Sequence, residues 1–309
     1  MKRIYLLVVL LFSYVGVMSC DFCNCYLGLD PGYNKNTIGL RANWRTAEWT
    51  PPVSGLRLAH NGHGVEGTMG HETLQESFIT GELFVKYSPI PKLRVYATLP
   101  YAFNTLEYDG VTESRNALSD LSLMAMYQLA NTMAHDSAKV RHRLFAGLGV
   151  KFPTGKSEGA SDVDIPMAHH LYSGTGSTDF LVSASYIGKL RKIGWNLDAS
   201  YKYNTPSAND YRYGNTLNIT PRVFYESKIK SVSLLPHVGA AYEMGDSDEY
   251  NDETVDETGG TTMYGSAGVD VYFGSISVTT DFRLPFYHDM GNQMSENQSW
   301  LFTSVNFHF

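Results

Sequence analysis

Residues 37–45 read TIGLRANWR, and their side chains alternate in character one by one. Ile38, Leu40, Ala42 and Trp44 are apolar or aromatic, whereas the residues between them are polar or small. Because successive side chains of a β-strand point to opposite faces, this period of two predicts a strand with one apolar face and one polar face.

The same alternation recurs along the chain and predicts about twelve strands, an even number of the kind found in single-chain bacterial outer-membrane barrels. Many of them exceed the usual five or six residues of a globular strand and suit the ~9–11 tilted residues that cross a bilayer. The predicted strands begin near Thr37, Ser77, Leu93, Asp120, Arg143, Asp179, Gly194, Asn215, Ser231, Thr262, Ser275 and Ser299.

The connections between these strands alternate between short and long, which is typical of short periplasmic turns and long extracellular loops. Lysine and arginine gather at the short turns, and acidic residues gather in the long loops. A secreted β-sandwich also alternates, but its outward faces are polar. Aromatic residues such as Tyr87, Tyr101 and Tyr127 lie near the ends of the apolar faces, as in interfacial girdles. The sequence therefore predicts an all-β protein, a transmembrane antiparallel up-and-down β-barrel over residues 37–309.

The bulk composition excludes several functions. The chain has 309 residues with a net charge of −7, which argues against nucleic acid as a partner because phosphate neutralisation needs a basic surface. No motif of nucleophilic or phosphoryl chemistry occurs, so we expect neither an enzyme nor a cofactor. Lys2 and Arg3 precede a short apolar stretch, which predicts a signal peptide over residues 1–19. Residues 20–36 would then form a periplasmic N-terminal tail.

The tail contains all three cysteines, Cys20, Cys23 and Cys25, and three interpretations remain open. Cys20 follows Val17-Met18-Ser19, an imperfect lipobox, and could be acylated. Two of the thiols could form a disulfide, which the periplasm permits, leaving the third free. Three thiolates could instead bind a soft ion such as copper(I) or zinc, which excludes acylation of Cys20.

Histidines in the first long loop form a second candidate metal site. His60, His63 and His71 lie in a glycine-rich stretch, and imidazole is a common ligand of transition metals. We expect the cysteines to stay at the periplasmic end of the barrel, opposite this loop. The acidic loop 246–257 suggests either a divalent-cation site or a solvated loop.

The predicted inward face carries charges of both signs. Its candidate lumen-lining residues are Arg41, Arg94, Asp120, Lys151, Asp179, Asp198, Arg222, His237, Asp270, Asp281 and Arg283. Twelve strands lie between an eight-stranded barrel filled by side chains and a sixteen-stranded open pore. A narrow polar channel and an interior sealed by paired charges are therefore both compatible with the pattern. We expect no apolar path on this face.

The last strand ends in an aromatic residue. Leu301, Thr303, Val305, Phe307 and Phe309 share one face, and Phe309 is the last residue of the sequence. A terminal aromatic closing an alternating strand predicts recognition by the outer-membrane barrel assembly machinery. The expected partners are thus this machinery and the lipids of the outer membrane.

Three motifs resemble a known family. They are Leu118-Ser119-Asp120-Leu121-Ser122-Leu123, Phe152-Pro153-Thr154-Gly155-Lys156, and Gly174-Thr175-Gly176-Ser177-Thr178-Asp179-Phe180. Together they resemble outer-membrane barrels of the phenol-degradation MetA-pathway family, labelled as transporters, and the Cys-x-x-Cys-x-Cys tail resembles a subgroup of it. The resemblance implies transport of small solutes, including small aromatic or hydrophobic compounds, across the outer membrane of a Gram-negative bacterium. A metal-handling barrel and a non-transporting structural or lipidated barrel are the alternatives.

Overall fold

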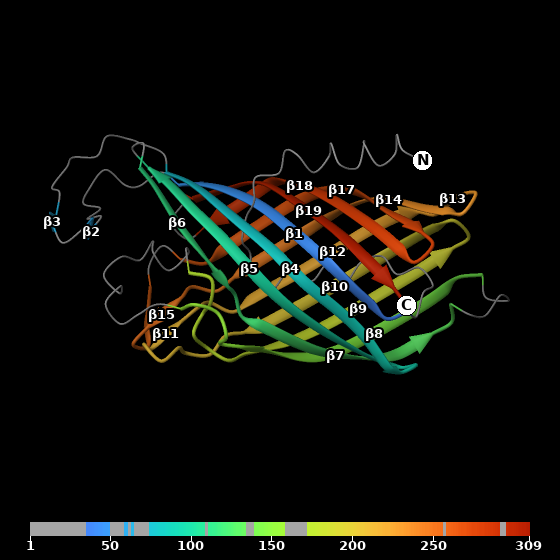
Figure 1. Ribbon diagram of the computed structural model, residues 1–309, viewed down its shortest axis with the longest axis horizontal. Helices are drawn as coiled ribbons and strands as arrows, with labels where there is room; N and C mark the ends of the chain where they lie inside the picture. Colours follow the sequence, from blue (N-terminus) through green and yellow to red (C-terminus); the bar gives the residue numbers. More distant parts are fainter. Residues whose placement is uncertain are drawn as a thin grey trace.

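The computed structural model describes residues 35–49, 59–60, 63–64, 74–108, 111–133, 139–157, 172–255, 258–290 and 295–309. Within these ranges, twelve long antiparallel strands form a closed barrel (Figure 1). The predicted signal peptide and the three cysteines lie outside the described residues.

The barrel strands follow one another around the wall in chain order. They are β1 (Thr37–Trp49), β4 (Leu74–Ile90), β5 (Leu93–Tyr108), β7 (Leu121–Asn131), β8 (Arg141–Phe152), β9 (Asp179–Leu190), β10 (Ile193–Tyr203), β12 (Thr216–Tyr225), β14 (Val232–Gly245), β17 (Gly260–Phe273), β18 (Ile276–Met290) and β19 (Ser295–His308). The predicted fold class is confirmed, and each strand begins within a few residues of the position that the alternation indicates.

Pairing of the first and last strands closes the wall. β1 pairs with β19 from Thr37↔His308 to Trp49↔Ser295, with a bulge between Arg45 and Ala47. The pairing of β12 with β14 joins the remaining two neighbours, so every barrel strand is paired on both sides. A closed barrel satisfies the backbone hydrogen bonds of every strand, which is the condition for a sheet to span a membrane.

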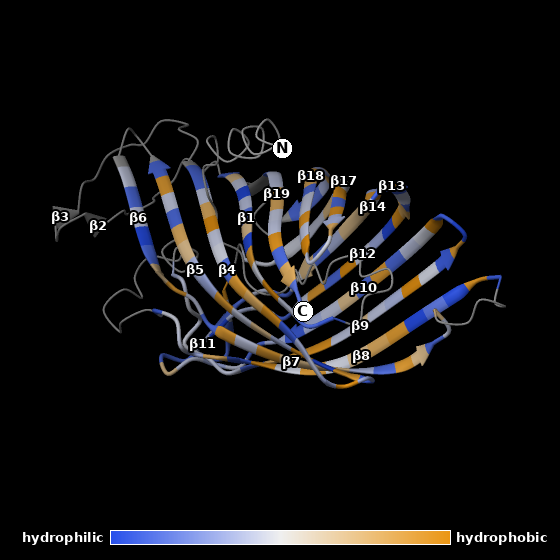
Figure 2. Cartoon of the chain, turned by 45° about the vertical axis from the view of Figure 1, so that its right-hand side comes forward, coloured by the Kyte–Doolittle hydropathy of each residue, from blue (hydrophilic) through white to orange (hydrophobic). Residues whose placement is uncertain are grey.

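The outer wall of the barrel is apolar. Leu40, Leu148 and Val238 are each more than 60% exposed, and the aromatic residues Tyr87 and Tyr127 are exposed near the strand ends. Figure 2 shows the alternation of hydrophobic and hydrophilic residues along each strand. Such a surface would be unfavourable in water, so it indicates a lipid environment. The described part of the chain contains no helix with the length and hydropathy needed to cross a membrane.

Several long connections contain strands of their own. β6 (Val111–Leu118) pairs with the far half of β5, and β11 (Tyr211–Arg212), β15 (Glu249–Tyr250) and β16 (Glu253–Thr254) form a small separate sheet. Both lie toward the left-hand end of Figure 1, where the long connections gather. The sequence indicated only loops in these places, because two-residue strands and a hairpin extension carry too short an alternating pattern to be recognised.

The opposite end of the barrel has short connections. β13 (Ser227–Ile229) pairs with the start of β14 and extends that hairpin beyond β12. It lies at the right-hand end of Figure 1, together with the short turns between β9 and β10 and between β17 and β18.

Candidate functional site in the barrel interior

Side chains on the inner face of the wall are densely packed. The eleven candidate lumen-lining residues are all buried, down to 1% exposure at Arg283 and 0% at Asp281. Their neighbours along each strand are exposed or partly exposed, as at Phe152 beside Lys151, so the buried set faces the interior. A wide water-filled pore would leave such groups accessible, so the interior is narrow and filled largely by protein atoms.

The first interior group surrounds the Lys151 ammonium at the end of β8 and is called the Lys151 cluster below. Lys151 Nζ lies 2.7 Å from Asp120 Oδ2 and 2.6 Å from Asp179 Oδ2, and it also donates to the Thr175 hydroxyl. All four residues are buried. The ammonium thus bridges the starts of β7 and β9, and one buried cation is shared by two carboxylates.

Backbone groups complete the Lys151 cluster. The amides of Gly155 and Thr175 donate to the two Asp120 carboxylate oxygens, at 2.9 and 3.0 Å. The Ser177 hydroxyl and the Thr205 amide donate to Asp179 Oδ1, at 2.8 and 3.1 Å. Because hydrogen bonds to charged groups are among the strongest in proteins, the cluster fixes segments 153–157 and 172–178 to the wall.

The three motifs that resemble a known family meet at this cluster. Asp120 comes from the first motif, Gly155 from the second, and Thr175 with Asp179 from the third. A Cβ on Gly155 would lie 2.9 Å from Asp120 Oδ1, and one on Gly174 would meet the Gly155 backbone at 2.7 Å. The motif glycines therefore allow two loop backbones to approach one carboxylate.

A second group lies around His237 on β14. His237 Nε2 is 3.0 Å from Asp281 Oδ2, and His237 Nδ1 is 3.5 Å from Asp270 Oδ2. Arg283 Nε donates to Asp281 Oδ1 at 2.8 Å, and its guanidinium lies 4.0 Å from the centre of the Trp300 ring. This group joins β14, β17, β18 and β19 through buried charges of both signs.

A third charged group joins the neighbouring strands β9, β10 and β12. Arg222 Nη1 lies 3.2 Å from Asp198 Oδ2, and the Ser185 hydroxyl donates to Asp198 Oδ1 at 2.6 Å. Asn196 also donates to Asp198, at 3.1 Å. The structure thus places the candidate lumen residues in ion-paired groups that span neighbouring strands.

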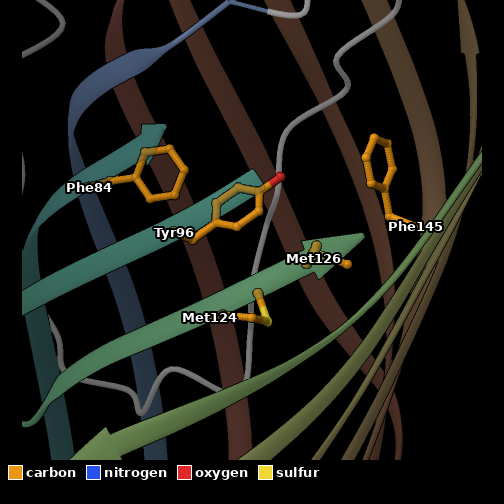
Figure 3. Packing of buried hydrophobic residues seen from close by; sticks show 5 residues of the cluster. All are labelled: Phe84, Tyr96, Met124, Met126 and Phe145. Atoms are coloured by element: carbon orange, nitrogen blue, oxygen red, sulfur yellow. The ribbon is translucent and has the colours of Figure 1, made fainter. Parts of the chain in front are cut away.

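The inner wall also carries buried apolar clusters, which the sequence did not lead us to expect. Phe84, Tyr96, Met124, Met126 and Phe145 form a buried cluster on the adjacent strands β4, β5, β7 and β8, called the apolar cluster below. Figure 3 shows these side chains on the inner side of the wall. The absence of an apolar path on this face stays a prediction, but the cluster places apolar side chains there, because β7 has apolar residues on both faces.

Glycines and arginines shape the apolar cluster. Met126 is paired with Gly147 and Met124 with Gly149, so long thioether side chains lie beside positions without a side chain. Arg41 lies with its guanidinium carbon 3.3 Å from the centre of the Phe84 ring, and that of Arg94 is 4.1 Å from the Phe145 ring. A cation over an aromatic face is attracted by the ring quadrupole. The cluster therefore presents apolar surface bordered by two cations.

The acidic loop is held by internal contacts. Asp248 is buried and accepts hydrogen bonds from the Tyr211 hydroxyl and from the Gly214 amide, the latter at 2.7 Å. Glu249 pairs with Arg212, with Nε at 3.0 Å, and its hydrogen bonds raise the pKa of that guanidinium. Asp256 and Glu257 lie outside the described residues. In the described ranges, no group of three or more His, Cys, Asp or Glu side chains could hold a metal ion.

Only part of the predicted histidine site is described. The backbones of His60 and His63 pair across the two-stranded sheet of β2 (Ala59–His60) and β3 (His63–Gly64). His71, like Cys20, Cys23 and Cys25, lies outside the described residues. The metal and lipidation hypotheses at these positions remain predictions.

Closure of the sheet, an apolar outer wall and a packed interior define a Gram-negative outer-membrane β-barrel. It therefore associates with outer-membrane lipids. Among solved structures, the chain is similar to the COG4313 outer membrane channel from Pseudomonas putida F1, with a TM-score of 0.63 and 16% identity over 91% of this chain and 100% of that chain.

Two further similarities are weaker. The β domain of the Bordetella autotransporter BrkA shares 11% identity over 89% of this chain and 100% of that one, with a TM-score of 0.48. LpxR from Salmonella typhimurium shares 9% identity over 88% and 100%, with a TM-score of 0.43. No protein-family model matches the sequence, and no curated protein matches it. Of these similarities, the one to the COG4313 channel supports the barrel fold.

Proposed function

We propose that this barrel is an outer-membrane channel or transporter for small solutes, and that it acts without a catalytic step. The fold is shared with a protein described as an outer membrane channel, which supports passage through the barrel. The densely packed interior restricts that passage to small molecules.

The solutes we propose are small aromatic or hydrophobic compounds. The observation that carries this proposal is the apolar cluster, because Tyr96, Met124 and Met126 place apolar side chains inside a wall that also carries buried charged groups. Apolar and aromatic surface with a few polar groups at its border is the usual lining of small-molecule sites. The resemblance of the motifs to the phenol-degradation MetA-pathway family, with its cysteine-containing subgroup, points to the same class of compound.

Permeability measurements test this assignment. Liposomes containing the barrel are compared for influx of 4-hydroxybenzoate and of arabinose, and planar bilayers give the single-channel conductance. The Met124→Gln/Met126→Gln variant keeps side-chain size and removes apolar surface, so we expect the ratio of aromatic to sugar permeability to fall several-fold. Met244→Gln, the same change on the exposed side of β14, is the control and should leave the ratio unchanged.

Two outcomes contradict the proposal. A folded barrel without conductance and without influx of either solute is a structural barrel. Unchanged selectivity in the double variant removes the apolar cluster from the path and leaves an unspecific narrow channel.

The second candidate function is metal handling. The backbone pairing of His60 with His63 favours it, since it brings two histidine positions opposite each other across a hairpin. Purified barrel is analysed for copper and zinc beside two variants, His60→Asn/His63→Asn and Cys20→Ser/Cys23→Ser/Cys25→Ser. Loss of metal in either variant supports the role of those residues, and equal metal in all three proteins eliminates it.

Processing and assembly are proposed from the chain ends. We infer cleavage after residue 19, with Cys20 acylated, disulfide-bonded or metal-bound, and recognition of Phe309 by the barrel assembly machinery. Mass spectrometry of the mature N-terminus distinguishes the states of Cys20. Deletion of Phe309 should lower the amount of folded barrel in the outer membrane, while the Phe309→Tyr variant, which retains a terminal aromatic, should not.

A further inference from the structure

Four exposed cations gather on two neighbouring hairpins at the short-turn end of the barrel. They are Arg191 and Lys192 in the β9–β10 turn, and Lys228 and Lys230 in and after β13, and they are called the basic patch below. The hairpins are adjacent because β10 pairs with β12, and the Glu226 amide donates to the Lys192 carbonyl at 2.7 Å. β9, β10 and β13 can be followed toward the right-hand end of Figure 1.

The basic patch has little compensating negative charge. Glu226 is the one carboxylate in the described segments 186–195 and 225–234, and it is already paired with the buried ammonium of Lys189. Arg141 lies opposite Lys189 across the β8–β9 pair and adds a further cation. The hairpins therefore carry a net positive charge that attracts an anion.

Turn geometry does not account for the basic residues. Arg191 and Lys230 both have φ of 56°, a left-handed conformation that favours glycine, asparagine or aspartate. The β17–β18 turn at the same end places Gly274 at the corresponding conformation, with φ of 66°, and has no cation. The chain thus keeps long basic side chains at two positions where the backbone alone would favour a different residue.

Exposed apolar side chains border the basic patch directly. Leu190, Ile193, Tyr225 and Ile229 are each more than 40% exposed on the same two hairpins. Lys192 Nζ lies 6.0 Å from the centre of the Tyr225 ring, so a cation stands beside an aromatic residue of the outer wall. Basic groups beside lipid-facing aliphatic and aromatic residues lie at the level of the lipid headgroups.

We propose that the basic patch binds the headgroup phosphates of anionic phospholipids in the periplasm-facing leaflet. The short turns of such barrels face the periplasm, which places the patch at that leaflet. Lipid fits better than an acidic protein, because the exposed apolar residues between the cations would contact acyl chains. The proposal depends on the barrel spanning the outer membrane and is independent of any transported solute.

Native mass spectrometry of the full-length barrel tests this proposal. Protein in a neutral detergent is titrated with palmitoyl-oleoyl phosphatidylglycerol or with the phosphatidylcholine of the same chains. We expect the barrel to retain phosphatidylglycerol in preference, and added salt to reduce this preference. The Lys192→Gln/Lys228→Gln variant should bind phosphatidylglycerol roughly 25-fold more weakly, because each of the two basic residues near a membrane surface contributes about a factor of five.

A variant of equal charge change provides the control. Lys92→Gln/Lys139→Gln removes two exposed cations from other short turns and should reduce phosphatidylglycerol binding less than about twofold. Heat-modifiable migration on gels shows that each variant is folded. Equal binding of the two lipids by the wild-type barrel, or equal loss in both variants, would overturn the proposal. Loss of poly-glutamate binding in the patch variant, with lipid binding unchanged, would overturn it in favour of a protein partner.

Discussion

Two regions of the same interior are built on opposite principles. The Lys151 cluster holds one ammonium between two carboxylates within 2.7 Å and adds backbone amides from two loops. The apolar cluster has no such directional bonds among Phe84, Met124 and Met126 and depends on packing. Ion pairs in low dielectric require a fixed geometry, whereas methionine side chains adapt their shape. The first region therefore fixes the loops, and the second can accommodate different small solutes.

Removal of the central cation should have the largest effect. Lys151→Met leaves Asp120 and Asp179 buried without their counter-ion, so we expect the free energy of unfolding to fall by about 3–5 kcal/mol. Urea unfolding of the barrel in lipid vesicles measures this change. A loss below about 1 kcal/mol would show that water reaches the cluster and that the region is not closed.

The same measurement on the apolar cluster should give a smaller loss. Met126→Ala removes a buried side chain beside Gly147, where no neighbour can fill the space, and we expect a loss of about 2–3 kcal/mol. Met126→Leu conserves the volume and should cost less than about 1.5 kcal/mol. If both variants are equally unstable, the cluster is rigid, and the contrast between the two regions fails.

Replacement of Arg94, which borders the apolar cluster, tests whether this cluster depends on ring contacts or on ion pairs. Arg94→Lys keeps the positive charge but loses the planar guanidinium over the Phe145 ring, so we expect a loss of about 1 kcal/mol. Thermal unfolding monitored by heat-modifiable gel migration follows the shift. A loss as large as that of Lys151→Met would mean that Arg94 acts through ion pairs instead of through the ring.

A partly exposed ion pair should have the smallest effect. Arg212 pairs with Glu249 in the small sheet formed by β11 and β15, outside the barrel wall. Arg212→Gln should lower the free energy of unfolding by less than about 1 kcal/mol, because exposed pairs are weak. One molar salt should abolish the difference from wild type, and its persistence in salt would place this pair with the buried groups.

Much of the fold could be predicted from the sequence because period-two alternation is a local signal. Stretches such as Leu93–Phe103 contain both faces of a strand within a few residues, so the strand positions and the inward set follow directly. The short strands β11, β15 and β16 could not be predicted, since two residues carry no period.

The contacts of the candidate site were harder to predict from the sequence. Asp120 and Thr175 are 55 residues apart, and only the register of three strands and two loops brings them together. The apolar cluster had a visible signal, since Leu121, Leu123, Met124, Ala125 and Met126 make β7 apolar on both faces. A strand that is apolar on both faces lacks the period-two contrast, so its inward residues cannot be told from its outward ones by pattern alone.

The reciprocal hydrogen bonds between Asn36 and Phe309, each at 3.0 Å, have a consequence for how the chain could be rearranged. These two residues adjoin the first and last strands, so a peptide link between them would make the barrel continuous, and new ends could be opened in the β9–β10 turn. Such a circular permutant retains every strand pair of the β1–β19 seam. It would place Phe309 inside the chain and so would test the proposed recognition of this residue as a terminal aromatic apart from its effect on folding.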